Sequence, residues 1–276
     1  MAKIIKKEML NTNVVSMTIE APRITAKAQA GHFVMLRIDP HGERFPLTIA
    51  DTDPFLGTLR IIFQVVGGST IKLNRLRQND DILDIVGPLG MSLAHEHVSH
   101  AIVIGGGVGC AIAYPHAKAL KQQGAKVSFV AGFRNRELFI LRDEIEQIAD
   151  EAYFTTDDGS SDRKGFVTDV LKELIEKQND VDLVIAIGPV AMMKAVANTT
   201  RDKNIHTVVS LNPIMIDGTG MCGGCRVRVG NEYKFACVDG PEFDGHLVDF
   251  DELMLRNSAY AQQEKHICQL TKEEEQ

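Results

Sequence analysis

The sequence predicts an antiparallel β-barrel, then a parallel α/β nucleotide-binding domain, then a small cysteine-rich region. Three observations carry this prediction. The first ~95 residues contain short alternating or apolar runs separated by Gly, Pro and Asp. From about residue 98 onward, apolar runs alternate with segments of helical period. Three of the five cysteines then fall within residues 222–237. We therefore expect domains at 1–97, 98–211 and 212–276.

Length and charge exclude several classes of function. At 276 residues the chain fits two domains with an appendage. Its net charge of −7, without a stripe of Lys and Arg, argues against binding of nucleic acid. The sequence contains no stretch of about 18 apolar residues, so no membrane span is expected. The start MAKIIKKEML lacks a long apolar run and a cleavage site, which indicates a cytoplasmic protein whose chain begins with a strand.

The barrel prediction depends on short strands. The clearest are 33–38 and 58–66, each rich in branched and aromatic residues and bounded by turn-forming residues. Several short strands at this spacing are typical of a small barrel or sandwich.

The second domain is predicted from a strand–helix alternation. A strand at 101–104 leads into glycines, and a helix follows as far as Gly124. The alternation continues with strands at 126–131, 152–156 and 183–187 and helices at 141–148, 166–177 and after Pro189. Strands that alternate with helices of this length indicate βαβ units and a parallel sheet.

A glycine loop joins the first of these strands to its helix. It consists of Gly105, Gly106, Gly107, Val108 and Gly109. Such a loop presents backbone N–H groups and a helix amino terminus to a phosphate, and glycines let the pyrophosphate approach the backbone. Cys110 occupies the last glycine position of the full dinucleotide motif. The alternative is a turn that only packs strand against helix.

Two acidic residues bear on the choice of nucleotide. Asp157 and Asp158 follow a predicted strand, at about the place where the adenosine ribose would lie. Carboxylates there would repel a 2′-phosphate, which favours NAD(H) over NADP(H). The alternative is that both belong to a solvated turn.

The cysteine cluster carries the most specific signal. Its spacing is Asp217-x4-Cys222-x2-Cys225-x11-Cys237, which follows the plant-type ferredoxin pattern with aspartate in the first position. A carboxylate is a harder ligand than a thiolate but holds iron. We therefore expect a [2Fe–2S] cluster. The alternatives are structural zinc with His246 as fourth ligand, or cysteines without metal.

Three segments together resemble a known family. They are Glu43-Arg44-Phe45-Pro46-Leu47-Thr48-Ile49-Ala50, the glycine loop with Gly188-Pro189-Val-Ala-Met-Met193, and the 217–237 cluster followed by 239–244. The chain resembles the ferredoxin–NADP reductase superfamily, in its iron–sulfur subgroup with the dihydroorotate dehydrogenase electron-transfer subunit. Aspartate at position 217 is associated with the small subunits of NADH-dependent reduced ferredoxin:NADP oxidoreductases, also found as sulfide dehydrogenase small subunits.

The resemblance implies an FAD site and a role for Thr48. The Thr48 hydroxyl is implied to lie near the flavin N5 and is the one candidate catalytic group. Gly188 and Pro189 are implied to lie beside the nicotinamide. The other implied FAD contacts are Arg44, Pro46, Leu47, Gln64, Val65, Gly68, Ser69 and Thr70. From the residues alone, Ser69 and Thr70 indicate only a helix cap.

The resemblance also implies an electron path. A hydride passes between NADH and FAD, and single electrons then pass through the cluster to a large subunit with its own flavin and iron–sulfur clusters. That partner would couple NAD(H), NADP(H) and ferredoxin by electron bifurcation. The 250–270 segment, predicted as a long acidic helical end, would suit the contact; the alternative is a helix that packs against a domain of this chain. The alternatives are the electron-transfer subunit of dihydroorotate dehydrogenase and a redox sensor that binds nucleotide without turnover.

Overall fold

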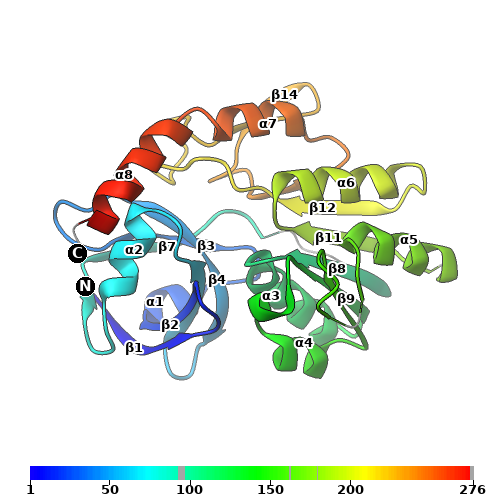
Figure 1. The fold of residues 1–276 in the computed structure, drawn as a ribbon, viewed down its shortest axis with the longest axis horizontal. Helices are drawn as coiled ribbons and strands as arrows, with labels where there is room; N and C mark the ends of the chain where they lie inside the picture. Colours follow the sequence, from blue (N-terminus) through cyan, green and yellow to red (C-terminus); the bar gives the residue numbers. More distant parts are fainter. Residues whose placement is uncertain (93–96, 162, 179, 274–276) are drawn as a thin grey trace.

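The computed structural model describes residues 1–92, 97–161, 163–178 and 180–273. It shows a barrel, a parallel-sheet domain, and a third region that arches over both (Figure 1). Among the helices of these residues, none combines the length and the apolar composition that a membrane span requires.

The N-terminal part is one curled sheet of seven antiparallel strands. Their order is β6-β1-β2-β5-β4-β3-β7. Because β6 and β7 are consecutive in the chain but lie at opposite edges, the sheet must curl to bring its edges together, which confirms the barrel prediction. The strands are β1 (Ala2–Met9), β2 (Val14–Glu20), β3 (Phe33–Arg37), β4 (Phe45–Asp53), β5 (Thr58–Gln64), β6 (Asp81–Ile82) and β7 (Asp84–Leu89).

The barrel interior follows from the alternation of apolar residues along the strands. Ile4, Met17, Ile19, Leu59 and Ile61 are fully buried. Two short helices flank the strands, α1 (Pro22–Thr25) and α2 (Gly68–Arg75).

The second part is a parallel sheet with one antiparallel edge strand. Its order is β10-β9-β8-β11-β12-β15, in which only β15 runs against its neighbour. The strands β8 (His100–Gly106), β9 (Lys126–Phe133), β10 (Glu151–Thr156), β11 (Leu183–Ile187) and β12 (His206–Ser210) form its parallel part. Strand β11 has the predicted bounds, because a continuous apolar run buried on both faces is a clear signal.

Helices cover both faces of this sheet. One apolar cluster joins the sheet to α3 (Gly109–Gln122) and α4 (Arg142–Ile148). The other joins it to α5 (Val167–Lys177) and α6 (Val190–Arg201). A short 3₁₀ helix, η1 (Arg136–Leu138), follows β9. Because the five strands run parallel, their carboxyl ends lie at the same edge of the sheet, and this edge faces the barrel (Figure 1).

The third region is attached to the second by hydrogen bonds. It holds the ribbon β13 (Arg226–Val229) and β14 (Glu232–Phe235), then β15 (Glu242–Asp244), which extends the parallel sheet beside β12. The prediction of one helical segment through 250–270 was wrong in one respect. The structure has two helices, α7 (Phe250–Asn257) and α8 (Ala261–Glu273), because α7 packs on α6 while α8 turns away to reach α2 of the barrel (Figure 1).

Candidate functional site

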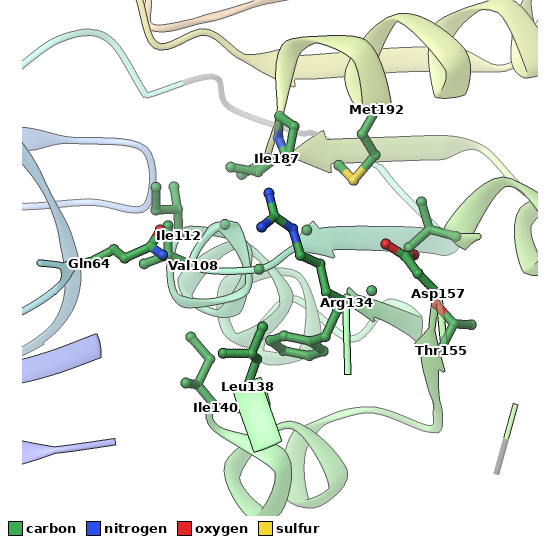
Figure 2. A pocket seen from close by; sticks show the side chains of 18 of the residues that line it. Gln64, Val108, Ile112, Arg134, Leu138, Ile140, Thr155, Asp157, Ile187 and Met192 are labelled. Carbon is green, nitrogen blue, oxygen red and sulfur yellow. The ribbon is translucent and has the colours of Figure 1, made fainter. Parts of the chain in front are cut away.

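A cavity of about 780 Å³ lies between the parallel sheet and the barrel. The ends of all five parallel strands contribute to it, and so do residues of the barrel (Figure 2). The strand-end residues are Gly106, Phe133, Thr155, Ile187 and Ser210, and those from the barrel are Asn11, Asn13, Val14 and Gln64. The carboxyl edge of such a sheet is where nucleotides bind in open α/β folds. Gln64, from the implied flavin set, and the glycine loop thus line the same cavity.

The glycines of the loop have two different roles. A Cβ on Gly105 would lie 2.6 Å from Cys110 Cα, and one on Gly109 would lie 2.3 Å from the carbonyl oxygen of Ile187. These two glycines allow close packing of strand and helix. Gly107 has φ of +57°, and a Cβ there would meet nothing within 4 Å. Gly107 therefore faces open cavity space, which fits a bound pyrophosphate.

The structure separates the two acidic residues. Asp157 lines the cavity, and its carboxylate projects into it (Figure 2). The Asp158 carboxylate instead accepts a hydrogen bond from the Ser160 N–H at 2.9 Å. Its interaction with the Ser160 hydroxyl, and then with this N–H, lowers the pKa of Asp158. Of the two aspartates, Asp157 is the one that lines the cavity.

Arg134 is a cavity residue that the sequence reasoning missed. It follows β9 directly, and its guanidinium stands in the cavity and points toward Ile187 (Figure 2). A guanidinium suits phosphate oxygens because its donors form a planar fork. Its position in the sequence could have indicated this role, because residues just after a strand of a parallel sheet lie at the edge where ligands bind.

The opposite wall of the cavity is apolar. Gly188 and Pro189 precede α6 and line the cavity together with Ile187 and Met192 (Figure 2). The Met192 sulfur packs over Gly106, since a Cβ at Gly106 would lie 2.5 Å from it. This wall suits a flat ring better than a phosphate.

The flavin motif forms the start of β4. Thr48 pairs with Phe33 of β3, and Pro46, Leu47 and Thr48 are all half-buried, so part of each side chain is available to a ligand. Arg44 lies in the preceding turn and is exposed. Its charge contributes to a lowered pKa of Asp217, after the larger effect of the Thr219 hydroxyl. Arg44 therefore lies near the cluster loop.

The turn before α2 is a helix amino terminus with open space around it. The Thr70 hydroxyl accepts hydrogen bonds from the N–H groups of Val66 (3.1 Å) and Gly67 (3.0 Å). Val65 donates its N–H to the Asn13 carbonyl at 2.8 Å, and the Ser69 hydroxyl donates to Glu43 at 2.9 Å. A Cβ on Gly67 would meet nothing within 4 Å. The turn thus fits a phosphate, with Thr70 as the cap that shapes it.

The structure brings two of the three clustered cysteines, Cys225 and Cys237, together. The Sγ atoms of Cys225 and Cys237 lie 3.2 Å apart, and both residues are buried, while Cys222 is exposed. The Gly220 N–H points at the Cys237 sulfur (3.2 Å) and the Gly224 N–H at the Cys222 sulfur (3.4 Å). Backbone N–H groups aimed at sulfur fit thiolate ligands of an iron–sulfur cluster.

Asp217 lies at the start of the same loop, and its carboxylate accepts a hydrogen bond from the Thr219 N–H at 3.1 Å. No three His, Cys, Asp or Glu side chains of the described residues converge as a site for a single ion. A binuclear cluster distributes its four ligands over two irons, so it does not need such convergence.

The alternative prediction that His246 is the fourth ligand of a structural zinc was wrong. The His246 Nε2 atom bonds to the Thr200 hydroxyl at 2.9 Å, in the packing of α6 against the third region. Cys110, in the first turn of α3, is fully buried in the core, and burial raises the pKa of its thiol.

The cluster loop lies on the barrel beside the flavin motif. A Cβ on Gly218 would lie 2.7 Å from the Met35 side chain of β3, the strand that pairs with the start of β4. The two predicted redox sites are therefore neighbours, although they are far apart in the sequence.

Comparisons with known proteins agree with this arrangement. Residues 212–249 match the iron–sulfur cluster binding domain of dihydroorotate dehydrogenase B, and residues 103–198 match the oxidoreductase NAD-binding domain. A Thermotoga maritima protein described as a homolog of the dihydroorotate dehydrogenase B (NAD⁺) electron transfer subunit is 45% identical, over 95% of this chain and 93% of its own. The corresponding subunit from Caldanaerobacter subterraneus is 34% identical, over 90% of this chain and 98% of its own.

Solved structures give the same picture. A chain from the structure of an NADH-dependent reduced ferredoxin-NADP oxidoreductase, studied for flavin-based electron bifurcation, superposes with a TM-score of 0.91 at 44% identity. The match covers 96% of this chain and 95% of that one. Phthalate dioxygenase reductase, at 16% identity and a TM-score of 0.65, shares the fold.

Proposed function

The chain belongs to the family of iron–sulfur electron-transfer subunits that includes those of dihydroorotate dehydrogenase B, and on that premise we propose that it relays electrons between NAD(H) and a large redox subunit. It is an oxidoreductase subunit with a NAD-binding domain and an iron–sulfur binding domain. Its cofactors are FAD, a [2Fe–2S] cluster and NAD(H). Electron-transfer subunits act within larger enzymes, so a catalytic partner is required.

We assign the nucleotide site to the 780 Å³ cavity. Gly107 faces the pyrophosphate with the neighbouring loop residues Gly105, Gly106, Val108 and Gly109, and Arg134 binds the phosphates by charge. Asp157 accepts hydrogen bonds from the adenosine ribose, which favours NAD(H). Gly188 and Pro189 hold the nicotinamide end against the apolar wall.

We assign the flavin to the face of the barrel beside this cavity. The turn from Val65 to Thr70 holds the diphosphate, and Gln64 lies where the two sites meet. Arg44, Pro46 and Leu47 contact the flavin, and Thr48 places its hydroxyl near the reacting nitrogen as a hydrogen-bond partner. FAD when bound supplies the exchange between two-electron hydride transfer and one-electron transfer. The protein contributes orientation and the exclusion of water.

We assign the cluster ligands to Asp217, Cys222, Cys225 and Cys237, and the domain boundaries to 1–97, 98–211 and 212–276. Because the loop lies against β3, electrons leaving the flavin site have a short path to it. Met221, next to Cys222, is 87% exposed, so the cluster side of the molecule offers an apolar contact to a partner.

The partner we propose is a large flavin and iron–sulfur subunit of a bifurcating NADH-dependent ferredoxin:NADP oxidoreductase. The observation that carries this choice is the 44% identity and TM-score of 0.91 over nearly the whole chain. NADP(H) and ferredoxin would act through that partner. The cytoplasm is the proposed location, since free thiols as iron ligands suit a reducing compartment. The second candidate, a dihydroorotate dehydrogenase subunit, is favoured by the 34% identical relatives.

The test is to purify the tagged chain without air from cells that make it naturally and to identify the large subunit that accompanies it. We expect the assembly to reduce NADP⁺ only when both NADH and reduced ferredoxin are supplied. Reduction of NAD⁺ by dihydroorotate would instead establish the second candidate. A chain that purifies alone and lacks NADH-dependent activity would contradict both.

A further inference from the structure

The last turn of α7 holds the cluster loop at two points. The Arg256 guanidinium donates a hydrogen bond to the carbonyl of Gly224 at 3.3 Å, and Gly224 lies between Cys222 and Cys225. Asn257 donates its side-chain N–H to the carbonyl of Asn212 at 3.3 Å. One helix end therefore contacts both the start of the third region and the centre of the metal-binding loop.

Arg256 is presented by a firmly packed helix. Phe250 and Leu253 of α7 are buried in the core shared with α5 and α6. The Asp249 carboxylate caps the helix by accepting from the Glu252 N–H at 3.0 Å, and Lys194 of α6 pairs with Asp251 at 2.7 Å. The backbone that carries the Arg256 guanidinium is therefore fixed by the packing of α7.

The backbone N–H and the carbonyl of Gly224 both have a partner. Its N–H points at the Cys222 sulfur, while its carbonyl accepts from Arg256. No carboxylate among the described residues forms an ion pair with Arg256, so its positive charge is not neutralised by such a contact. A cation beside a thiolate loop stabilises the more negative, reduced state of a bound cluster.

We propose that Arg256 is a positioning residue for the iron–sulfur cluster, which fixes the 222–225 loop through the Gly224 carbonyl and raises the reduction potential of the cluster by its charge. The inference deepens the proposed function and rests on it, because it presumes that the loop binds a [2Fe–2S] cluster. It predicts that helix α7 is part of the redox site and not only of the core.

The experiment compares Arg256→Gln and Arg256→Lys with Arg201→Gln in the complete chain, purified without air. Arg201 is a matched control, because it also ends a helix and donates to a backbone carbonyl, that of His246 at 2.9 Å, away from the cluster loop. The readouts are iron per chain and a redox titration of the cluster followed by electron paramagnetic resonance.

We expect Arg256→Gln to raise the oxidised-to-reduced ratio at the wild-type midpoint about threefold, which is a shift of about −28 mV for a one-electron couple. Arg256→Lys keeps the charge and should restore most of the potential, and Arg201→Gln should leave it unchanged. Loss of iron in Arg256→Gln, but not in Arg201→Gln, would also support the positioning role. If Arg256→Gln does not fold, Arg256→Met repeats the titration with the aliphatic stem retained.

A wild-type iron content and potential in Arg256→Gln would overturn the proposal, and so would an equal shift in Arg201→Gln. If the unaltered chain binds no iron, the proposed function fails instead. The two failures are therefore distinguishable.

Discussion

The sulfur atoms of Cys225 and Cys237 lie 3.2 Å apart inside the protein, although twelve positions separate the residues in the sequence. Burial and the neighbouring Cys225 thiol both raise the pKa of Cys237. Two thiolates at this distance would repel each other, and a bound cation removes that repulsion. Binding of a metal centre by both sulfurs would therefore relieve the repulsion between the two thiolates.

Cys237→Ser is expected to abolish cluster binding. The serine hydroxyl is a harder and far less acidic group than the thiol, so iron per chain should fall from about two to near zero. Iron analysis and the visible spectrum measure this. Cys268→Ser is the control and should keep its iron, because the Cys268 sulfur lies beside the Val66 carbonyl, away from the cluster loop. Equal iron in both variants would contradict the assignment.

Replacement of Asp217 tests the unusual ligand. Asp217→Cys should retain about two irons and change the absorption and resonance spectra, because a thiolate replaces an oxygen ligand. Asp217→Ala should weaken iron retention at least about tenfold, as expected when support of a metal centre is lost. The measurement is iron loss against a chelator. Identical retention in Asp217→Ala and the unaltered chain would exclude Asp217 as a ligand.

Gly107→Ala is expected to weaken NADH binding while the fold persists. The new methyl group would occupy the cavity, and the left-handed backbone adds about 1 kcal/mol of strain. We expect a loss of affinity of roughly tenfold or more, or about 1.4 kcal/mol, measured by titration calorimetry.

Gly124→Ala is the matched control for this variant. Gly124 also has a positive φ (+90°) with nothing within 4 Å of a Cβ, but it ends α3 far from the cavity. It should lose similar stability and keep its NADH affinity. If both variants bind NADH equally well, Gly107 does not face the nucleotide.

Asp157→Asn is expected to shift preference toward NADPH. Removal of one negative charge close to the 2′-phosphate should improve kcat/KM for NADPH relative to NADH roughly five- to tenfold, or about 1 to 1.5 kcal/mol. Flavin reduction by each nucleotide measures the ratio. Asp158→Asn should leave the ratio unchanged, because its carboxylate is engaged with Ser160 outside the cavity. A larger change in Asp158→Asn would reverse the assignment.

The sequence predicted the elements best where burial decides them. The strand 183–187 is an uninterrupted apolar run, and the structure has it with the same bounds. The break between α7 and α8 was missed because residues 258–260 contain no glycine or proline. That break comes from tertiary packing, since the two helices contact different domains.

The sequence could predict which residues belong to the site, but it could not predict how they are arranged in space. The sequence pattern cannot show that Gly107 faces open space while Gly105 and Gly109 pack against their neighbours. Nor can it show which of two adjacent aspartates faces the cavity. A single arginine after a strand resembles a solvated residue, so Arg134 emerged only when the strand ends were brought together.

In the proposed function, electrons from NADH reach a [2Fe–2S] cluster through the flavin of this chain. The most direct measurement is to purify the chain without air, quantify its iron, and record absorption and electron paramagnetic resonance spectra before and after NADH is added. We expect a flavin that bleaches and a reduced-cluster signal from about two irons per chain. Zinc in place of iron, or a flavin that bleaches while no cluster signal develops, would contradict it.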